Sequence, residues 1–308
     1  MIGDAGVLGV LKPPGPTSQQ VVAELRRWLG GGVRVGHGGT LDPAAAGVLP
    51  VGFGAATRLL RFLHLAPKVY RFELVLGLET DSWDQTGRVV AERPAAHLGA
   101  SDLEGILAAF TGPVRQQVPQ YSARHVDGRR LYEYARRGEL AAAPETEVTI
   151  HALELAAWAP GAHPRALCTV RCSAGTYVRS LAEAMGRRLG VGGHLGALVR
   201  LEAGGLSAQA CCTLEEFRGA VTHGAWGEWV LPPAIALGFL PAVQLDPAEA
   251  DRVASGIPPG RRPAGVGEGP GPVRLLRPGG ALAAVAQREV AGNAASFRLE
   301  CVLSGERQ

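Results

Sequence analysis

The run KVYRFELVLGL (residues 68–78) constrains the fold of this chain more than any other segment. Its side chains at Tyr70, Phe72, Leu74 and Leu76 are apolar or aromatic and recur at every second position. That period is typical of a strand with one buried face, whereas a helix would repeat every three to four residues. The run therefore predicts a long strand.

Four further segments are predicted to be strands, because they are short apolar runs bounded by turn-forming or charged residues. They are residues 7–12, 48–54, 146–158 and 165–173. Three others have apolar side chains at helical spacing and are predicted to be helices. They are residues 18–29, 101–112 and 175–190.

Local signals mark where these helices begin. Thr17 with Gln20, and Ser101 with Glu104, have the spacing of a capping box, in which two side chains satisfy the free amides of a first helical turn. In the third helix Arg179 falls in the first turn, next to the end of the preceding strand. Its apolar face consists of Val178, Leu181, Ala182, Met185 and Leu189.

The length of 308 residues favours about two domains. A composition shift near residue 241 leads into short strand-like runs and Gly/Pro-rich loops, which predict a separate all-β module of about 65 residues. We therefore expect a first domain over residues 1–240 and a second over residues 241–308.

Charge, hydropathy and cysteine spacing bear on the partners, the location and the metal content of the protein. The net charge is only +3, so charge by itself does not indicate a nucleic-acid partner. The chain has no apolar run of 18 residues and no basic leader, which favours a cytoplasmic protein with no membrane partner. Its five cysteines form no CxxC pair and no zinc-type spacing, so no metal site is expected.

Residues 110–138 are the most basic part of the sequence. They carry six arginines against Asp127 and Glu133, with three tyrosines interleaved. Such a segment is either a solvated surface loop and helix or an arm that grips phosphates and stacks bases on its aromatic rings. The residues alone leave both interpretations open.

Asp42 is a lone carboxylate in the glycine-rich stretch VGHGGTLDP (residues 35–43). The chain has no phosphate-binding GxxxxGK[ST] loop, no GxSxG, no HExxH, and no GxGxxG between a strand and a helix. The residues favour chemistry that needs one ionised carboxylate, an aromatic platform and an arginine. From the residues alone, Asp42 is either catalytic or a turn former before Pro43.

Six motifs, in order, resemble those of the TruB-type tRNA pseudouridine(55) synthases over residues 7–217. They are GVLKPPGPTS, VGHGGTLDPAAAGVLPV, GAATRLL, KVYRFELVLG, FTGPVRQQVPQYSARHVDGRRLYEYAR and SAGTYVRSLAEAMG. The resemblance implies a mixed α/β (α+β) catalytic fold around a large, mainly antiparallel sheet, followed by a small PUA-like β module. It also implies an isomerase that turns uridine into pseudouridine without any cofactor.

The resemblance further implies roles for individual residues. Asp42 matches the catalytic aspartate, and Arg179 matches the arginine that pairs with it. Tyr70 matches the tyrosine that packs on the target base and helps to remove the C5 proton. It belongs to a K-x-Y motif that begins at Lys68, which is expected to contact the substrate. His37 matches the histidine that fills the space left by the flipped uridine. Tyr177 and Leu198 match residues that line the uracil pocket.

The substrate implied by the resemblance is the T-arm of tRNA, recognised by its folded shape. Phosphate contacts are expected from seven arginines: Arg124, Arg129, Arg130, Arg136, Arg137, Arg187 and Arg188. We expect a monomer that needs no protein partner. Two alternatives stay open, a tRNA-folding chaperone and a guide-dependent subunit of an RNA–protein complex, although the arginine-rich arm speaks against the latter.

Overall fold

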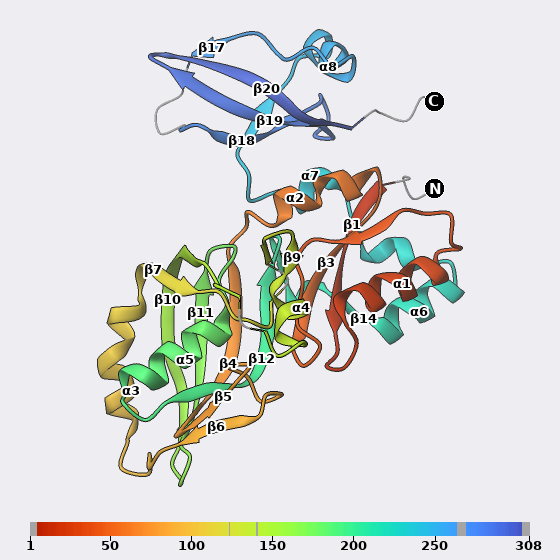
Figure 1. Cartoon of the computed structure of the whole chain (residues 1–308). Helices are drawn as coiled ribbons and strands as arrows, with labels where there is room; N and C mark the ends of the chain where they lie inside the picture. Colours follow the sequence, from red (N-terminus) through yellow and green to blue (C-terminus); the bar gives the residue numbers. More distant parts are fainter. Residues whose placement is uncertain (1–4, 123, 140, 264–268, 304–308) are drawn as a thin grey trace.

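The computed structural model describes residues 5–122, 124–139, 141–263 and 269–303. Its centre is an eleven-stranded mixed sheet, which confirms the predicted α/β class (Figure 1). Along the main path the strands are β14 (Cys212–Thr213), β1 (Ala5–Lys12), β3 (Ala46–Gly54), β12 (Gly193–Ala203), β4 (Lys68–Leu76), β11 (Arg165–Cys172), β10 (Glu145–Ala159) and β7 (Gly112–Gln117).

Three short strands complete this sheet: β2 (Val35–His37) beside β3, β13 (Leu206–Ser207) beside β12, and β15 (Val230–Leu231) beside β1. Most neighbours run antiparallel, as expected. Two pairs are parallel, β1 with β14 and β3 with β12. The second of these joins the two halves of the sheet, because β12 pairs with β3 on one side and with β4 on the other.

The long strand predicted from alternation is β4. Tyr70, Phe72, Leu74 and Leu76 are all buried in one core cluster, as the period of two required. The strand stops at Leu76 rather than at residue 78, because Gly77 has φ +85° and turns the chain into the separate strand β5 (Leu78–Thr80). β5 pairs with β6 (Val89–Glu92) in a hairpin.

Two predicted helices are confirmed. Helix α1 (Ser18–Trp28) begins with the expected capping box: the Gln20 amide donates to the Thr17 hydroxyl over 3.1 Å, and the Thr17 amide donates to Gln20 Oε1 over 2.7 Å. Helix α5 (Val178–Arg188) covers the apolar face of β4 and β12 with its own apolar face.

The predicted start of the helix near residue 101 is wrong. Helix α3 (Ala100–Leu107) begins at Ala100, and the Asp102 carboxylate accepts the Gly99 amide over 2.7 Å. Ser101 is already inside the first turn, and Glu104 is exposed. The Gly99 cap therefore decides where the helix begins, and the buried side chain of Leu103 packs it on the core cluster. The helix continues only as a 3-10 turn, η2 (Ala108–Phe110).

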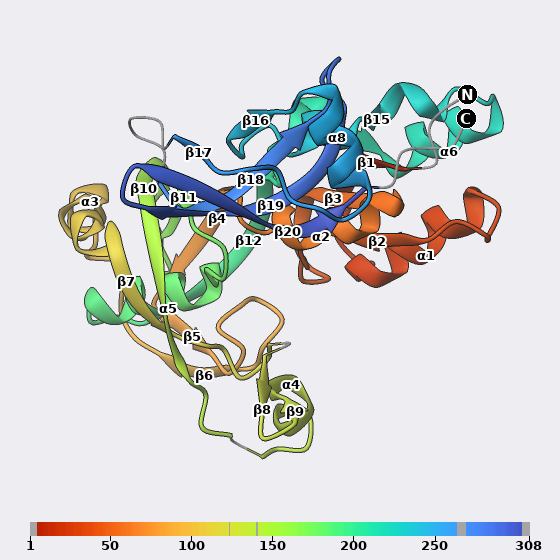
Figure 2. The same cartoon turned by 90° about the horizontal axis from the view of Figure 1, so that it is seen from above.

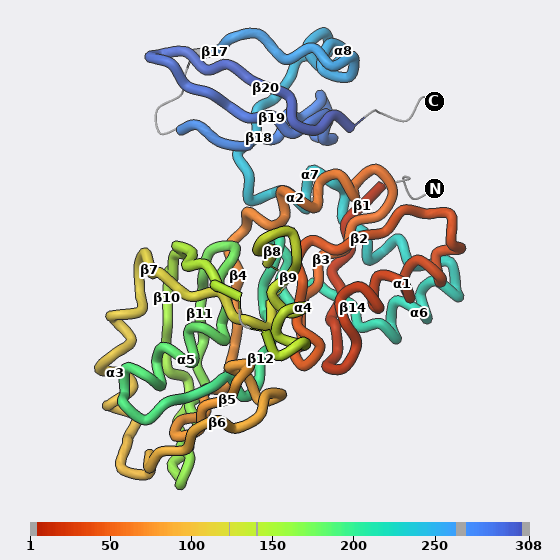
Figure 3. Tube along the Cα trace, viewed as in Figure 1, coloured from red at the N-terminus to blue at the C-terminus, as the bar shows by residue number. Residues whose placement is uncertain are grey.

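Short elements fill the rest of the first part. They are η1 (Ala55–Leu59), α2 (Leu60–Leu63), η3 (Ala208–Ala210), α6 (Leu214–Thr222), η4 (Trp226–Trp229) and α7 (Pro233–Ala236). Between β7 and β10 the chain leaves the large sheet, forms β8 (His125–Val126), β9 (Arg129–Arg130) and α4 (Leu131–Ala135), and returns (Figures 2 and 3). This excursion contains most of the basic segment 110–138, whose first residues belong instead to η2 and β7. We call residues 118–144 the arm.

The C-terminal part forms a second sheet, in the order β16 (Ala242–Gln244), β18 (Gly271–Leu276), β19 (Leu282–Ala291), β20 (Ala294–Val302) and β17 (Arg262–Pro263). The expectation of an all-β module missed helix α8 (Pro247–Ala254). The Asp246 side chain caps this helix by accepting the Glu249 amide over 2.7 Å. The sequence did contain signals for the start of this helix, namely the capping box of Asp246 with Glu249 and the proline at the first helical position.

The second sheet packs directly on the first part of the chain. Leu59 and Leu63 share one buried cluster with Leu282, Val285 and Leu303. Polar contacts add to this interface. The guanidinium of Arg274 donates to the carbonyls of Ala234 (2.7 Å), Leu240 (2.9 Å) and Gly238 (3.4 Å), and Arg58 donates to Val302 O over 2.9 Å.

Candidate active site

Asp42 lies in the loop between β2 and β3, and its neighbours in that loop are tied down through their main chain. The Leu41 amide donates to Ser18 Oγ over 2.9 Å, and the same hydroxyl donates to Leu41 O over 3.1 Å. Asp42 O accepts the Ala45 amide over 3.1 Å, and Pro43 O accepts the Gly15 amide over 2.8 Å. The carboxylate therefore stands on a backbone that has little freedom to move.

Two buried cations hold this loop from both ends. Lys12 Nζ donates to the carbonyls of Pro13 (2.8 Å), Pro16 (2.8 Å) and Pro43 (3.1 Å). Arg200, on β12, donates to the carbonyls of Gly39 (3.0 Å) and Thr40 (3.3 Å). Sequence reasoning assigned no role to either residue. The one signal for Lys12 was that it is one of only two lysines in the chain.

Asp42 forms an ion pair with Arg179. Arg179 Nη2 lies 3.1 Å from Asp42 Oδ2, and the arginine side chain is 6% exposed whereas the aspartate side chain is 45% exposed. The structure thus brings together the two residues that the resemblance linked. The cation is fixed within the protein, while the carboxylate stays open to a ligand.

Arg179 also contacts a second carboxylate, which sequence reasoning missed. Its Nη1 lies 3.6 Å from Asp84 Oδ2. Asp84 Oδ1 accepts hydrogen bonds from Ser82 Oγ (2.8 Å) and Thr86 Oγ1 (2.6 Å). The spacing Ser-x-Asp-x-Thr in residues 82–86 was the available signal. Arg179 is therefore held between two carboxylates, and only one of them faces solvent.

The arm is attached to the same arginine. Arg179 Nη2 donates to Tyr121 O over 3.0 Å, at the start of the arm. The base of the arm is therefore bonded to the same side chain that pairs with Asp42.

Tyr70 lies opposite Arg200 in the pairing of β4 with β12. Its side chain is buried, and burial raises the pKa of its phenol, while the positive charge of Arg200 opposes that shift. Leu198 pairs with Phe72 in the same register and is half-buried beside the core cluster. Tyr70 and Leu198 thus come from neighbouring strands at the centre of the sheet.

Lys68 has a different environment from that expected of a substrate contact. It is buried, and its ammonium donates to the carbonyls of His64 (2.6 Å) and Ala66 (3.0 Å). Burial, followed by the charge of Arg200, lowers the pKa of Lys68 to about 8. Its position supports a structural role at the start of β4.

His37 ends β2 and is half-buried, and its Nδ1 has no hydrogen-bond partner within the described ranges. Burial, followed by the charge of Arg200, lowers the pKa of His37, so its ring is neutral at pH 7.

Tyr177 caps α5, and its amide donates to Gln116 Oε1 over 3.1 Å. Gln116, not anticipated from the sequence, also donates to Gly175 O over 2.8 Å and so orders the turn before Arg179.

The arm presents its arginines to solvent. Asp127 (φ 50°) and Gly128 (φ 81°) form the two-residue turn between β8 and β9, a conformation that Asp-Gly favours. Arg124, Arg129 and Arg130 are exposed. Tyr132 lies beneath Arg136, whose guanidinium is 5.1 Å from the ring centre. Ala123 and Leu140 are outside the described residues.

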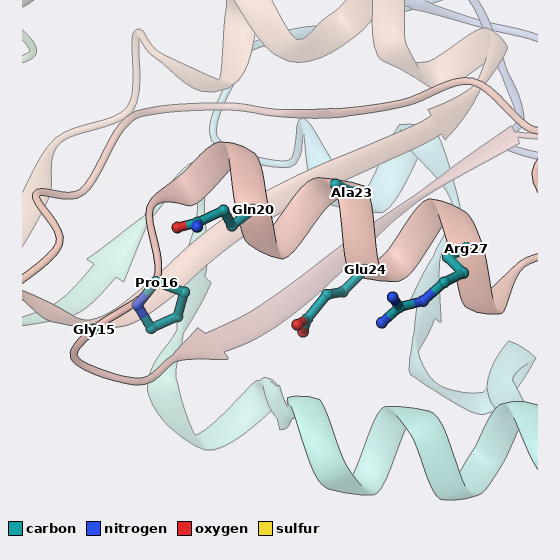
Figure 4. A pocket seen from close by; sticks show the side chains of 6 residues that line it. All are labelled: Gly15, Pro16, Gln20, Ala23, Glu24 and Arg27. Atoms are coloured by element: carbon teal, nitrogen blue, oxygen red, sulfur yellow. The ribbon is translucent and has the colours of Figure 1, made fainter.

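Arg187 and Arg188 lie elsewhere, at the C-terminal end of α5. They line a groove of about 480 Å³ between α5 and β7, together with Trp83, Phe110 and Arg115. A second hollow, on α1, is lined by Gly15, Pro16, Gln20, Ala23, Glu24 and Arg27 (Figure 4). Asp42, Tyr70 and Arg179 line neither of these two hollows.

Within residues 5–122, 124–139, 141–263 and 269–303, no group of three or more His, Cys, Asp or Glu side chains is arranged to hold a metal ion. In the same ranges no helix is long and apolar enough to cross a membrane.

Comparison with known proteins gives consistent matches. The model of the TruB family pseudouridylate synthase N-terminal domain matches residues 26–178. The chain is 47% identical over 253 residues to the tRNA pseudouridine synthase B of Moorella thermoacetica, covering 82% of each chain. It is 46% identical over 257 residues to that of Symbiobacterium thermophilum, covering 83% of this chain and 84% of the relative.

Solved structures share the fold over nearly the whole chain. A chain of a Cbf5–Nop10–Gar1 complex has a TM-score of 0.74 and 24% identity, covering 97% of this chain and 84% of its own length. A chain of an H/ACA RNP bound to a substrate RNA has a TM-score of 0.68 and 22% identity, covering 97% and 86%. Because its identity to its bacterial relatives extends over more than four-fifths of their length, the chain belongs to the TruB family of pseudouridylate synthases.

Proposed function

We propose that this chain isomerises uridine to pseudouridine in tRNA, at position 55 of the T-loop, with Asp42 as the catalytic residue. The observation that carries the proposal is the 3.1 Å pair of a solvent-open Asp42 and a buried Arg179, on a loop anchored at both ends. The relatives named tRNA pseudouridine synthase B support tRNA as the substrate.

The reaction breaks the C1′–N1 bond of the uridine and forms a C1′–C5 bond, while C5 loses a proton and N1 gains one. Atoms and charges balance within the nucleotide. The base must first leave its stack, since C1′ and C5 are otherwise out of reach. Asp42 then attacks the ribose, removes the C2′ proton, or adds to C6 of the uracil.

The residues around Asp42 serve this chemistry. Arg179 pairs with the Asp42 carboxylate and holds it in one direction. Tyr70 and Leu198 line the place of the uracil ring, and Tyr70 helps to remove the C5 proton. Tyr177 adds the side of the pocket nearest α5. The neutral ring of His37 fills the gap that the flipped base leaves.

RNA binding is assigned to the arm and to the C-terminal module. Exposed arginines at positions 124, 129 and 130 supply phosphate contacts, and the bond from Arg179 to Tyr121 O connects this grip to the catalytic carboxylate. We propose a catalytic domain over residues 1–240 and a PUA-like domain over residues 241–308 that reaches toward the acceptor stem. With an RNA grip of its own, the chain acts as a monomer in the cytoplasm without a protein partner.

The test uses a T-arm hairpin RNA that carries tritium at C5 of uridine. Purified protein should release tritium to water with or without a chelator, and Asp42→Asn should release none while binding the same RNA. No release by the wild-type chain, despite salt-sensitive binding, would reject catalysis on this hairpin and favour a tRNA-folding chaperone.

A further inference from the structure

Arg200 is the largest side chain in the described core that is completely buried, with 1% of its surface exposed. Its planar guanidinium donates in three directions to main-chain carbonyls. Nη2 reaches Gly39 O (3.0 Å), Nη1 reaches Thr40 O (3.3 Å), and Nε reaches Val48 O (2.7 Å). Gly39 and Thr40 precede Asp42, and Val48 follows it, so one side chain holds both ends of the catalytic loop.

The hydrogen bonds of Arg200 go to neutral acceptors. Over the described ranges it makes no ion pair with a carboxylate. A buried guanidinium without a counter-ion is costly, and a hydrophobic side chain would fill the same space at lower cost. What the arginine provides instead is a rigid fork of donors, which sets the relative directions of several groups at once.

Arg200 also lies beside Tyr70, because the two residues are paired across β4 and β12. The positive charge of the guanidinium acts on the phenol and opposes part of the rise in its pKa that burial causes. Arg200 therefore joins the loop that carries Asp42 to the residue that lines the uracil pocket.

We propose that Arg200 is a positioning residue for the isomerisation, which sets the placement of Asp42 relative to Tyr70. The inference rests on the proposed function. Since Arg200 is buried, it acts on the catalytic step through these two groups and makes no contact with RNA. A misplacement of about 1 Å in a catalytic site is enough to lower a rate by about 100-fold.

Arg274 offers a control within the same chain. It also donates to three main-chain carbonyls, those of Ala234, Leu240 and Gly238, but at the interface with the C-terminal sheet. Its guanidinium is directed into the protein, and the T-arm hairpin contains no acceptor stem for the C-terminal module to reach. Both substitutions remove hydrogen bonds within the fold, but only Arg200 contacts the loop of Asp42, so a positioning effect would appear only in the Arg200 variants.

The experiment compares Arg200→Lys, Arg200→Met and Arg274→Met with the wild-type chain under single turnover, with enzyme in excess over tritiated T-arm hairpin. We expect Arg200→Met to lower the saturated rate by about 100-fold and Arg200→Lys by about tenfold. The Kd for the hairpin should stay within about twofold in every variant, and Arg274→Met should keep the wild-type rate. A wild-type rate in Arg200→Lys, or a weaker Kd with an unchanged rate, would overturn the proposal.

Amide hydrogen exchange gives a readout that does not depend on activity. Peptides covering residues 36–48 should exchange faster in Arg200→Lys than in the wild-type chain, and should not change in Arg274→Met. Unchanged exchange over these residues in a folded Arg200→Lys would overturn the positioning role. An inactive wild-type chain with the expected exchange pattern would instead reject the proposed function and leave the positioning of the loop supported.

Discussion

Arg179 pairs with Asp42 at 3.1 Å, and the two side chains differ sharply in exposure, 6% for the arginine and 45% for the aspartate. The buried partner is held on three sides, by Asp42, by Asp84 and by the carbonyl of Tyr121. A fixed cation behind a solvent-open carboxylate holds that carboxylate in one direction, aimed at a ligand.

Replacing Asp42 should abolish catalysis and spare binding. Asp42→Asn keeps the size of the side chain but removes the charge that attacks the ribose or accepts a proton. We expect the rate of tritium release from C5 to fall by at least about 1,000-fold. The Kd of the T-arm hairpin, measured by fluorescence anisotropy, should change by less than about threefold, because Asp42 supplies no phosphate contact. Measurable turnover by Asp42→Asn would exclude this carboxylate as the catalytic group.

Asp84 should matter through Arg179. Asp84→Asn removes one of the two charges that hold the guanidinium, so we expect the single-turnover rate to fall about tenfold, equivalent to ~1.4 kcal/mol of transition-state stabilisation. Asp81→Asn is the matched control, since Asp81 lies in the same loop but binds Arg88, through the Arg88 amide (2.9 Å) and Nε (3.3 Å). Equal effects of the two substitutions would point to the loop as a whole instead of the contact with Arg179.

The arm should contribute salt-dependent affinity. Replacing Arg129 and Arg130 together by alanine should weaken hairpin binding. It should also reduce the slope of log K against log salt by about one for each phosphate that the variant no longer neutralises. Arg88→Ala serves as the control, because Arg88 is a highly exposed arginine outside residues 118–144. An unchanged slope in the double variant would show that these arginines are only a solvated surface.

Stability should depend on pH through Lys68. Its pKa is about 8 in the folded chain and near 10.5 in the unfolded chain, so between these values the unfolded state binds more protons. Stability relative to Lys68→Met should therefore rise as the pH increases from about 8 to 10.5, by up to ~3 kcal/mol. Urea unfolding of both chains at several pH values measures this, and a pH-independent difference would mean that Lys68 stays charged when folded.

Much of the framework followed from local sequence. The period of two in residues 68–78 predicted β4, and helical spacing with a capping box predicted α1, because both depend on near neighbours in the chain. Two helix starts were missed although their signals are local. The cap of α3 is Gly99, whose amide donates to Asp102, and α8 was overlooked although Asp246 and Glu249 form a capping box at its start.

The sequence by itself determined the family resemblance, and through it the prediction that Asp42 pairs with Arg179. Only the tertiary structure decided what surrounds them. Arg200 lies 158 residues after Asp42 in the chain, and Asp84 and Tyr121 come from a loop and an arm that share no local pattern with either. The contacts of Arg200 with the Asp42 loop, and of Arg179 with Asp84 and Tyr121, depend on how β12, α5 and the arm pack around Asp42. That packing brings residues together regardless of their separation in sequence.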